Sequence, residues 1–511
     1  MTGTELVALI PLMVLAGAAV LVLLSVAWRR SHGVAAGIAA LGFVAAGGLV
    51  PLARARGAVE VTMLLRTDGL HHLFTLILCA AGLVCALLAR SYFRDGRVSG
   101  GIPAGEDASN GSQPGSTVGN QGAESGGSRS VPQPPEELYA LLLMGTLGAA
   151  VLAGSVHFAS LFLGLEILSV SLYGLVAYTR HRDRALEAGI KYLILAGASS
   201  AFLLFGVALV YAVSGRLDLA VLAELLGGPA RGSLLAAAGL GLLFVAVGFK
   251  LALVPFHLWT PDVYQGAPAP ATAFVASVSK AGIFALAVRL FLTGEAAAAT
   301  GLLYPALAAV AVASMVLGNL LALLQEDLKR LLAYSSIAHL GYLLVALLAG
   351  GSLGLEGGIY YLVAYLVTIL AAFGVVATTS TGDSEPSRLE SYRGLFWHRP
   401  GLATVLTVAL LSLAGIPLTA GFLGKLYVLA AGVGATRWVL TLTLALTSAV
   451  GLFYYLRVVV VMLTTTDEAP DLARTGILGG AVLTVLTLLL LGLGTWPPAL
   501  IATIRAMVSF P

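Results

Sequence analysis

"VGFKLALVPFHLWTPDVYQGAPAP" occupies residues 247–270 and ends a long apolar segment with a lysine, a histidine, an aspartate and four prolines. Proline removes a backbone donor and clashes with the carbonyl four residues earlier, so Pro255 is expected to break the helix. Within a membrane, freed backbone groups are tolerated only where they are buried in protein or face a wet cavity. Lys250 is therefore expected beside carbonyls that can accept hydrogen bonds and hold water.

The composition of the chain is that of an integral membrane protein. Its 511 residues are 59% hydrophobic and 10% charged, with a mean hydropathy of +0.96, whereas soluble domains are about 25% charged. The net charge of +3 is small and scattered, which argues against a nucleic-acid partner and leaves the lipid bilayer as the surrounding medium. Cys79 and Cys85 match no metal or disulfide spacing, so no metal site is expected.

Apolar segments long enough to cross a bilayer recur along the whole sequence. A span needs about 20 apolar residues, and this criterion predicts an all-α membrane protein with fourteen spans. They are expected near residues 5–28, 33–52, 69–90, 136–154, 156–179, 186–214, 232–256, 268–293, 299–324, 329–349, 353–379, 401–432, 436–463 and 472–495. Residues 54–68 alternate apolar and polar side chains and predict a small hairpin outside the membrane.

The basic residues and one long polar stretch predict how the chain is oriented. Residues 97–135 are rich in Gly, Ser and Pro and cannot bury enough apolar surface to fold, which indicates a disordered loop. Fifteen basic residues lie on the side of the loop after the first span and seven on the other, so the positive-inside rule places the first side in the cytoplasm. With fourteen spans, both termini are expected outside.

Lysine and arginine are sorted differently along the chain. Of five lysines, only Lys329 lies in a clear loop, whereas Lys191, Lys250, Lys280 and Lys425 lie within or at the edge of apolar spans. A charge at mid-membrane costs roughly 2.5–3.5 kcal/mol. A buried lysine can lose its proton, which an arginine does not, so these four lysines are candidate proton carriers. The alternative is that some of them extend to an interface or only hold helices together.

A buried acid and a second broken helix complete the pattern. Glu166 has no basic residue three or four positions away, so it is either neutral or matched by a lysine of another helix, as a relay group or as a structural ion pair. Gly415 and Pro417 interrupt the twelfth span, ten and eight residues before Lys425. Paired broken segments indicate inverted repeats around a midplane ion site, here spans four to eight and nine to thirteen.

Two histidines could extend the relay. His339 lies within the tenth span near the hydroxyls of Tyr334, Ser335, Ser336 and Tyr342, and His257 follows the first break. Imidazole suits proton relay, although a structural histidine is an equally good interpretation of His339. We expect protons to move along titratable groups bridged by water. The sequence has no nucleotide-binding loop and no cysteine cluster, so the driving force must come from partner subunits or an ion gradient.

These segments resemble the antiporter-like membrane subunits of respiratory complex I, the proton-pumping NADH:quinone oxidoreductase, and among them the subunit N group. The resemblance rests on "LFLGLEILSVSLYGLVAY" (161–178), "EAGIKYLILAGASSAFLLFG" (187–206), "FKLALVPFHLWTPDVYQGAPAPATAF" (249–274), "VSKAGIFA" (278–285), "QEDLKRLLAYSSIAHLGY" (325–342) and "LAGIPLTAGFLGKLYVL" (413–429). The stretch "TPDVYQGAP" (260–268) and the lysine at position 425 are similar to subunit N in particular.

The resemblance implies an architecture and roles for individual residues. It implies fourteen helices, with helices seven and twelve discontinuous and two inverted five-helix repeats. Residues 1–96 would hold helices one to three, 97–135 the loop, 136–293 and 294–463 the two repeats, and 464–511 the last helix and tail. Glu166 and Lys250 would form the coupling pair, Lys280 the central relay and Lys425 the exit group, with Lys191 as an accessory.

The resemblance also implies what the chain works with. Its partners would be other membrane and peripheral subunits of complex I in a bacterial plasma (inner) membrane. The chain itself would bind no cofactor, while NADH, FMN, iron–sulfur clusters and quinone would belong to partner subunits. Three alternatives remain: a subunit of a multi-subunit cation/proton antiporter, a subunit of a membrane hydrogenase, and a membrane scaffold whose charges carry no protons.

Overall fold

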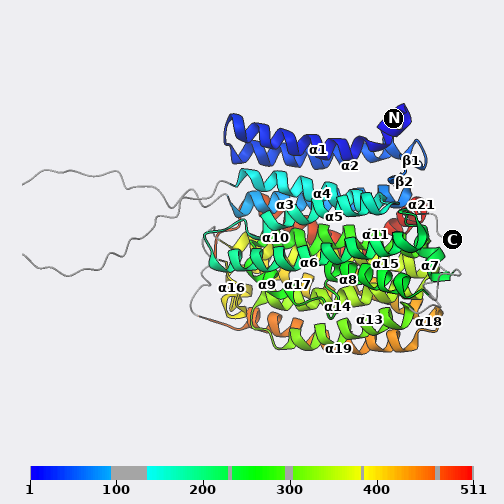
Figure 1. Cartoon of the computed structure of the whole chain (residues 1–511). Coiled ribbons are helices and arrows are strands. Elements are labelled where there is room, and N and C mark those ends of the chain that lie inside the picture. Colours follow the sequence, from blue (N-terminus) through cyan, green and yellow to red (C-terminus); the bar gives the residue numbers. More distant parts are fainter. Residues whose placement is uncertain are drawn as a thin grey trace, which may run out of the picture.

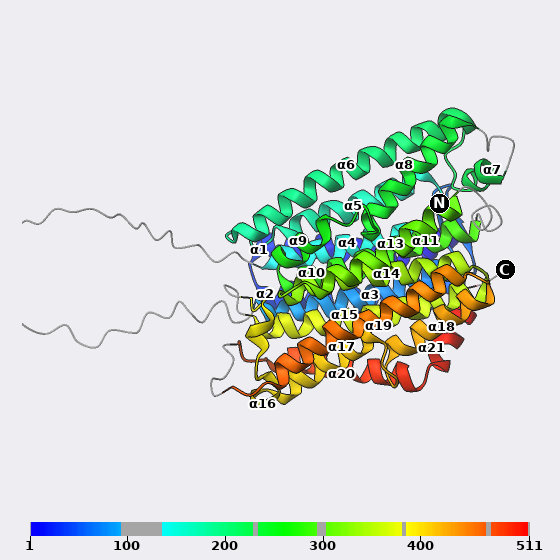
Figure 2. The same cartoon turned by 90° about the horizontal axis from the view of Figure 1, so that it is seen from below.

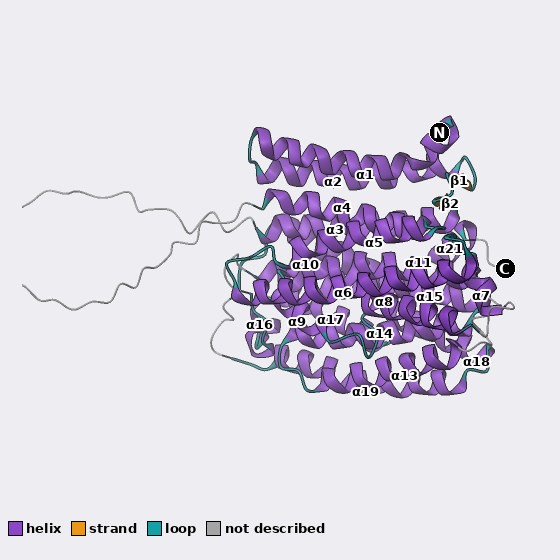
Figure 3. Ribbon diagram, viewed as in Figure 1, coloured by secondary structure: helices purple, strands orange, loops and turns teal. Residues whose placement is uncertain are grey.

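The computed structural model describes residues 2–93, 135–227, 233–293, 303–380, 385–466 and 472–508. Nearly all of these residues are helical, and the helices lie side by side in a flattened bundle (Figures 1–3). In this part of the chain, thirteen helices are long and apolar enough to cross a membrane. The expected all-α membrane fold is confirmed.

The first part of the chain supplies the outer layer and the first broken helix. Its elements are α1 (Gly3–Trp28), α2 (His32–Arg54), β1 (Val59–Val61), β2 (Leu65–Thr67), α3 (Gly69–Tyr92), α4 (Glu136–Gly154), α5 (Phe158–Val176), α6 (Asp183–Ser214), α7 (Val221–Gly227), α8 (Leu234–Leu251), α9 (Trp259–Gly266), α10 (Ala269–Phe274), the π-helical η3 (Val275–Ser279) and α11 (Lys280–Thr293). The strands β1 and β2 pair antiparallel, which confirms the hairpin expected at residues 54–68.

The second part supplies the centre of the bundle and the second broken helix. Its elements are α13 (Leu303–Leu323), α14 (Leu328–Ala349), α15 (Gly351–Thr379), the 3-10 helix η4 (Leu389–Tyr392), α16 (Leu395–His398), α17 (Pro400–Ala414), α18 (Ala420–Gly434), α19 (Trp438–Leu463), α20 (Ile477–Thr495) and α21 (Pro498–Met507). Helices α14 and α15 are buried over most of their length, whereas α6 and α20 expose most of theirs. The short helix α21 was not expected from the sequence.

Each of the fourteen expected spans overlaps one long helix, with two exceptions. The eighth span overlaps α10, η3 and α11 together, and the twelfth overlaps α17 and α18. Helices α8 and α9 form one interrupted pair, and α17 and α18 form the other, so that the twelfth expected span is two helices of 15 residues. The start of α1 and the helix α21 lie at the same end of the bundle, which we call the N-terminal end (Figure 1). At the opposite end α3 finishes and α4 begins, and we call it the α3–α4 end (Figure 1). This agrees with an even number of crossings.

Some expectations are not tested by this structure. The expected loop at residues 97–135 lies outside the described residues, apart from its last residue. Which end of the bundle faces the cytoplasm, the two-repeat relationship and the five domain boundaries stay predictions. The two interrupted pairs do run in opposite directions, because α8 enters from the N-terminal end and α17 enters from the α3–α4 end (Figure 1).

Glycines allow several helices to cross at close range. A Cβ on Gly206 of α6 would lie 2.9 Å from the carbonyl oxygen of Gly239 of α8, and a Cβ on Gly239 would lie 3.0 Å from the carbonyl oxygen of Gly206. Gly148 of α4 and Gly164 of α5 meet in the same way. Without a hydrophobic driving force between helices in lipid, such close backbone contact is what holds membrane helices together.

We predict that Gly206→Val destabilises the packing of α6 against α8 by about 1–3 kcal/mol, because the added side chain forces the two helices apart. The matched control is Gly197→Val on the same helix, where an added Cβ meets no atom within 4 Å. Thermal unfolding of the purified protein in detergent compares the two variants. Equal unfolding temperatures for both would contradict the close-contact account.

Candidate functional site

The first helix break has a defined hydrogen-bond geometry. Helix α8 ends at Leu251, and Ala252 adopts the left-handed conformation with φ of 59°. The next residue, Leu253, donates its N–H to the carbonyl of Gly248 at 2.9 Å, which closes the helix in a Schellman-type turn. The chain then passes Pro255 and resumes as α9 at Trp259, so the break lies where the sequence predicted it.

Side chains from other elements bind the carbonyls at the end of α8. Lys280 donates its ammonium to the Lys250 carbonyl at 2.9 Å, and the Trp259 indole N–H donates to the Phe249 carbonyl at 3.1 Å. The expectation that the Lys250 ammonium binds these carbonyls was wrong: Lys280 takes that place, and the Lys250 ammonium donates to the Ser169 hydroxyl of α5 at 2.7 Å. Lys250 is 4% exposed and Lys280 is 0% exposed, so the fold brings these two predicted residues together in the interior.

The second break repeats the same arrangement. Helix α17 ends before Gly415, whose φ of 86° is the left-handed conformation that favours glycine, and Ile416 donates to the Leu411 carbonyl at 3.0 Å. Lys425 of α18 reaches back to the end of α17. Its ammonium donates to the carbonyls of Leu413 and Ala414 at 2.7 and 3.0 Å, and to the Ser448 hydroxyl at 2.7 Å.

These contacts explain how the lysines are tolerated in the interior. The C-terminal end of a helix carries about half a negative charge, and a partly buried cation there gains up to about 2 kcal/mol. A hydrogen bond to a charged group adds about 1.5–3 kcal/mol. Together these gains match the roughly 2.5–3.5 kcal/mol that a charge at mid-membrane costs. Each break therefore creates the site that holds its lysine.

Glu166 is close to this site but does not touch a lysine. Its carboxylate accepts a 2.5 Å hydrogen bond from Ser200 of α6, and the described residues show no ion pair between it and a lysine. Ser169, which binds Lys250, lies one turn further along the same helix. The expected Glu166–Lys250 coupling is thus not a direct contact in this structure. Instead, α5 carries the carboxylate and the lysine's hydroxyl partner one turn apart.

His339 forms the centre of a hydroxyl network in the second half of the bundle. Its ring nitrogens lie 2.6 Å from the Tyr361 hydroxyl of α15 and 3.1 Å from the Tyr455 hydroxyl of α19. The expected partners were hydroxyls of its own helix, and of these only Tyr342 contacts the imidazole, by packing edge-on at 5.3 Å. Lys425 lies 5.4 Å from the same Tyr342 ring. Lys425 and His339 therefore both contact the ring of Tyr342.

A chain of hydroxyls joins this network to the first break. The Tyr365 hydroxyl donates to Ser336 at 2.7 Å, and the Tyr264 hydroxyl of α9 lies 3.3 Å from the same Ser336 oxygen. The ring of His339 packs against Tyr365 at 5.6 Å. Hydrogen-bonded hydroxyls therefore lead from Tyr264 of α9 to Tyr365, whose ring packs against His339.

The two remaining accessory candidates lie toward the α3–α4 end. Lys191 is not buried: its side chain is 44% exposed and pairs with Glu187 at 2.7 Å and Asp262 at 2.9 Å. His257 lies in the segment between α8 and α9 and is buried, and its Nδ1 atom has no hydrogen-bond partner in the described residues. Neither residue contacts Lys250 or Lys280 directly.

The structure corrects the expectation that Lys329 lies in a loop. It is the second residue of α14 and is 0% exposed. Its ammonium donates to the Ala267 carbonyl at 2.6 Å, just past the end of α9, and to Glu385 at 2.7 Å. The loop assignment was wrong, because α14 begins at Leu328, within the short polar run "QEDLKR". A buried acid from a distant segment, which the sequence did not point out, allows the helix to begin there.

Glu385 is held by four groups from across the α3–α4 end. Besides Lys329, its carboxylate accepts hydrogen bonds from the Tyr92 hydroxyl at 2.6 Å and the Ala269 N–H at 2.8 Å, and Arg182 lies 3.8 Å away. Burial raises the pKa of Glu385. The positive charges of Lys329 and Arg182, with the hydrogen bonds from Lys329 and Tyr92, lower it by more than burial raises it. The pKa of Glu385 therefore lies below its ordinary value of 4.5.

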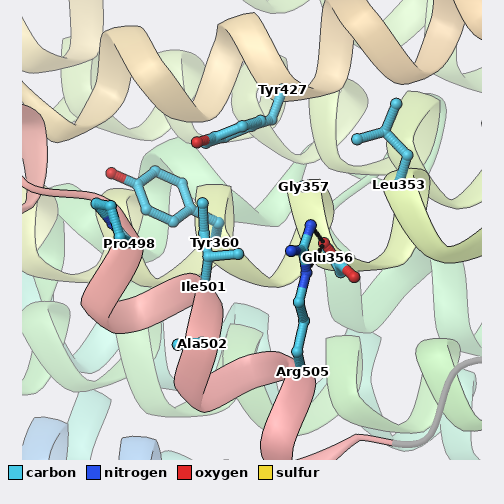
Figure 4. Close-up of a pocket in the computed structure, with 9 residues that line it drawn as sticks. All are labelled: Leu353, Glu356, Gly357, Tyr360, Tyr427, Pro498, Ile501, Ala502 and Arg505. Carbon is cyan, nitrogen blue, oxygen red and sulfur yellow. Dashed lines mark hydrogen bonds and ion pairs between the residues drawn. The ribbon is translucent and has the colours of Figure 1, made fainter.

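The N-terminal end of the bundle carries a separate pocket of about 470 Å³ beneath α21 (Figure 4). Arg505 of α21 pairs with Glu356 of α15 at 2.9 Å, and Tyr360 and Tyr427 face the same space. No described contact connects this pair to the buried lysines. Among the described residues, no three His, Cys, Asp or Glu side chains are grouped to hold a metal ion, and the absence of a cofactor stays a prediction.

The arrangement of broken helices and buried lysines matches a known family. Residues 155–451 match the family described as NADH:quinone oxidoreductase/Mrp antiporter, TM. The chain belongs to this family. The matched region includes both interrupted helices and every buried lysine described above. As a member of the NADH:quinone oxidoreductase/Mrp antiporter family, the chain is an antiporter-like, multi-pass membrane subunit.

Solved structures agree with the family assignment. A chain of respiratory complex I from Thermus thermophilus is 32% identical, with 96% of this chain and 98% of that chain covered and a TM-score of 0.76. Two others show a shared fold at lower identity. A chain of the archaeal membrane-bound sulfane sulfur reductase has a TM-score of 0.79 at 23% identity, covering 98% of this chain and 97% of that one. A chain of the Mrp complex from Dietzia sp. has a TM-score of 0.79 at 21% identity, covering 99% of this chain and 98% of that one.

We predict that Ser169→Ala destabilises the protein by about 1.5–3 kcal/mol, because the Lys250 ammonium loses a hydrogen-bond partner in the interior. Ser171→Ala on the same helix is the control, since its hydroxyl only binds the Ile167 carbonyl. Thermal unfolding measures both. A Ser169→Ala variant as stable as the control would show that Lys250 does not depend on this hydroxyl.

We predict that Glu385→Gln costs about 3–5 kcal/mol near neutral pH, because it leaves the buried Lys329 without its counter-charge. The native pKa of Glu385 is lowered, so its stabilisation is present above the ordinary value of 4.5 and is lost as the pH falls through the lowered pKa. The gap in unfolding temperature between wild type and Glu385→Gln should therefore narrow on acidification. The control is Glu390→Gln, at an exposed neighbouring position, which should unfold at the same temperature as wild type at every pH.

Proposed function

We propose that the chain is the N-type subunit of a proton-pumping NADH:quinone oxidoreductase and carries protons through its buried lysines. The observation that carries the proposal is that Lys280 and Lys425 bind the carbonyl ends of two oppositely directed broken helices. The 32% identity to a chain of respiratory complex I over almost the whole length favours that complex over the other relatives. NADH, FMN, iron–sulfur clusters and quinone would be held by partner subunits.

Each predicted residue has a role that fits its position. Glu166, held by Ser200, is the charge that partner subunits would move or neutralise, and Lys250 responds one turn away through Ser169. Lys280 binds the Lys250 main chain, so two positive charges here repel each other strongly in a medium of low dielectric. Protonation of one lysine therefore favours proton release from the other.

The released proton would continue through the hydroxyl route toward His339 and Lys425. Tyr264, Ser336 and Tyr365 lie between the first break and the imidazole of His339, and each hydroxyl can accept one proton while it donates another. Lys425 would then pass the proton toward the N-terminal end. Lys191 and His257 would act as accessory groups at the α3–α4 end.

We expect Lys250→Met to lower NADH-driven proton translocation by roughly a factor of ten or more, because the relay loses its first basic group. The measurement is acidification of inverted membrane vesicles in which the assembled complex is quantified. Arg393→Met, which removes an exposed cation at the α3–α4 end, is the control and should translocate protons normally.

Unchanged translocation in a fully assembled Lys250→Met complex would favour the scaffold alternative. The partners that copurify with the chain separate the remaining alternatives. NADH dehydrogenase subunits would support the proposal, whereas hydrogenase subunits, or sodium-dependent transport without NADH oxidation, would contradict it.

A further inference from the structure

A polar pocket of about 160 Å³ opens between α6 and α9 at the α3–α4 end. It is lined by Arg184, Glu187, Ala188, Lys191, Asp262, Gln265 and Gly266. This volume is large enough to hold water. Its charged groups form one connected set, because Asp262 accepts hydrogen bonds both from Lys191 at 2.9 Å and from Arg330 at 2.8 Å.

Two buried aromatic side chains lie close in the chain to residues that line this pocket. Tyr192 follows Lys191 on α6, and Trp259 lies three residues before Asp262 on α9. The two rings are 4.9 Å apart, and Phe249 lies 5.4 Å from Trp259. All three are buried. The same two helices thus carry a charged pair that faces the pocket and a buried aromatic pair.

Both lysines of the first break lie against this aromatic pair. The Lys280 ammonium is 4.7 Å from the centre of the Trp259 ring, and the Lys250 ammonium is 6.0 Å from the centre of the Tyr192 ring. An ammonium over an aromatic face is attracted by the ring electrons. The aromatic pair therefore contacts both lysines and belongs to the same two helices that line the polar pocket.

We propose that the pocket between α6 and α9 is the site where protons enter from the α3–α4 end, and that Tyr192 and Trp259 are the gate that separates it from Lys250 and Lys280. This inference rests on the proposed function. When the rings part, water in the pocket relays a proton from the α3–α4 side to the neutral amine of a lysine, which becomes an ammonium, and the relaying water is left neutral. The Lys191–Asp262 ion pair joins α6 to α9 and so holds the gate closed.

The test is passive proton conductance of the intact complex reconstituted in lipid vesicles, without NADH. A potassium diffusion potential drives protons, and an internal pH-sensitive dye reports them. Tyr192→Ala, and Tyr192→Ala together with Trp259→Ala, should raise the conductance several-fold over wild type. Phe244→Ala is the control, because it removes an aromatic side chain that packs on Phe256 away from this pocket, and it should match wild type.

Wild-type conductance in assembled Tyr192→Ala complexes would overturn the gate. This single variant leaves the Trp259 bond to Phe249 intact, so it answers the question even if the double variant does not assemble. The outcome is independent of the Lys250→Met experiment. Pumping lost in Lys250→Met with no leak in Tyr192→Ala refutes the gate alone, whereas normal pumping in Lys250→Met refutes the proposed relay itself.

Discussion

The hydrogen bond from a lysine ammonium to the carbonyl end of an interrupted helix is the contact on which this structure depends. It occurs three times, at the ends of α8, α9 and α17, with Lys280, Lys329 and Lys425 as donors. A broken helix leaves carbonyls without partners in the interior, and a buried lysine leaves an ammonium without partners. Either one alone is costly, and together they satisfy each other. This is why the breaks and the lysines occur together.

The three contacts differ in how the positive charge is balanced. Lys329 has Glu385 as a direct counter-charge, whereas in the described part of the chain Lys280 and Lys425 have no carboxylate within ion-pair distance. A fully paired buried ion pair is held in one state, because loss of either charge strands the other. An ammonium held only by neutral carbonyls and hydroxyls can release its proton with less penalty. The difference fits the proposed roles: Lys329 stabilises the packing of its helix, and Lys280 and Lys425 carry protons.

The surroundings of the first break connect the membrane interior to the α3–α4 end. Helix α9 carries Trp259 toward the lysines, Tyr264 toward the hydroxyls of α14 and α15, and Asp262 toward the polar pocket. Lys329 and Glu385 fix the end of this short helix and the start of α10, which leads to Lys280. This helix of eight residues therefore contacts Lys280, Ser336 and Lys191, which belong to three parts of the proposed route.

The sequence by itself determined the membrane class, the position of every span, the hairpin and both helix breaks. These follow from local properties: apolar length, alternation, and the missing donor of proline. It also pointed to Lys250, Lys280 and Lys425 as interior residues. Only the tertiary structure decided their partners, because Ser169, Ser448, Tyr361 and Tyr455 come from helices far apart in the chain. Lys329 is in the interior and not in its expected loop for the same reason. Whether a lysine near a helix start is buried depends on which distant segment covers it, and no local pattern records that.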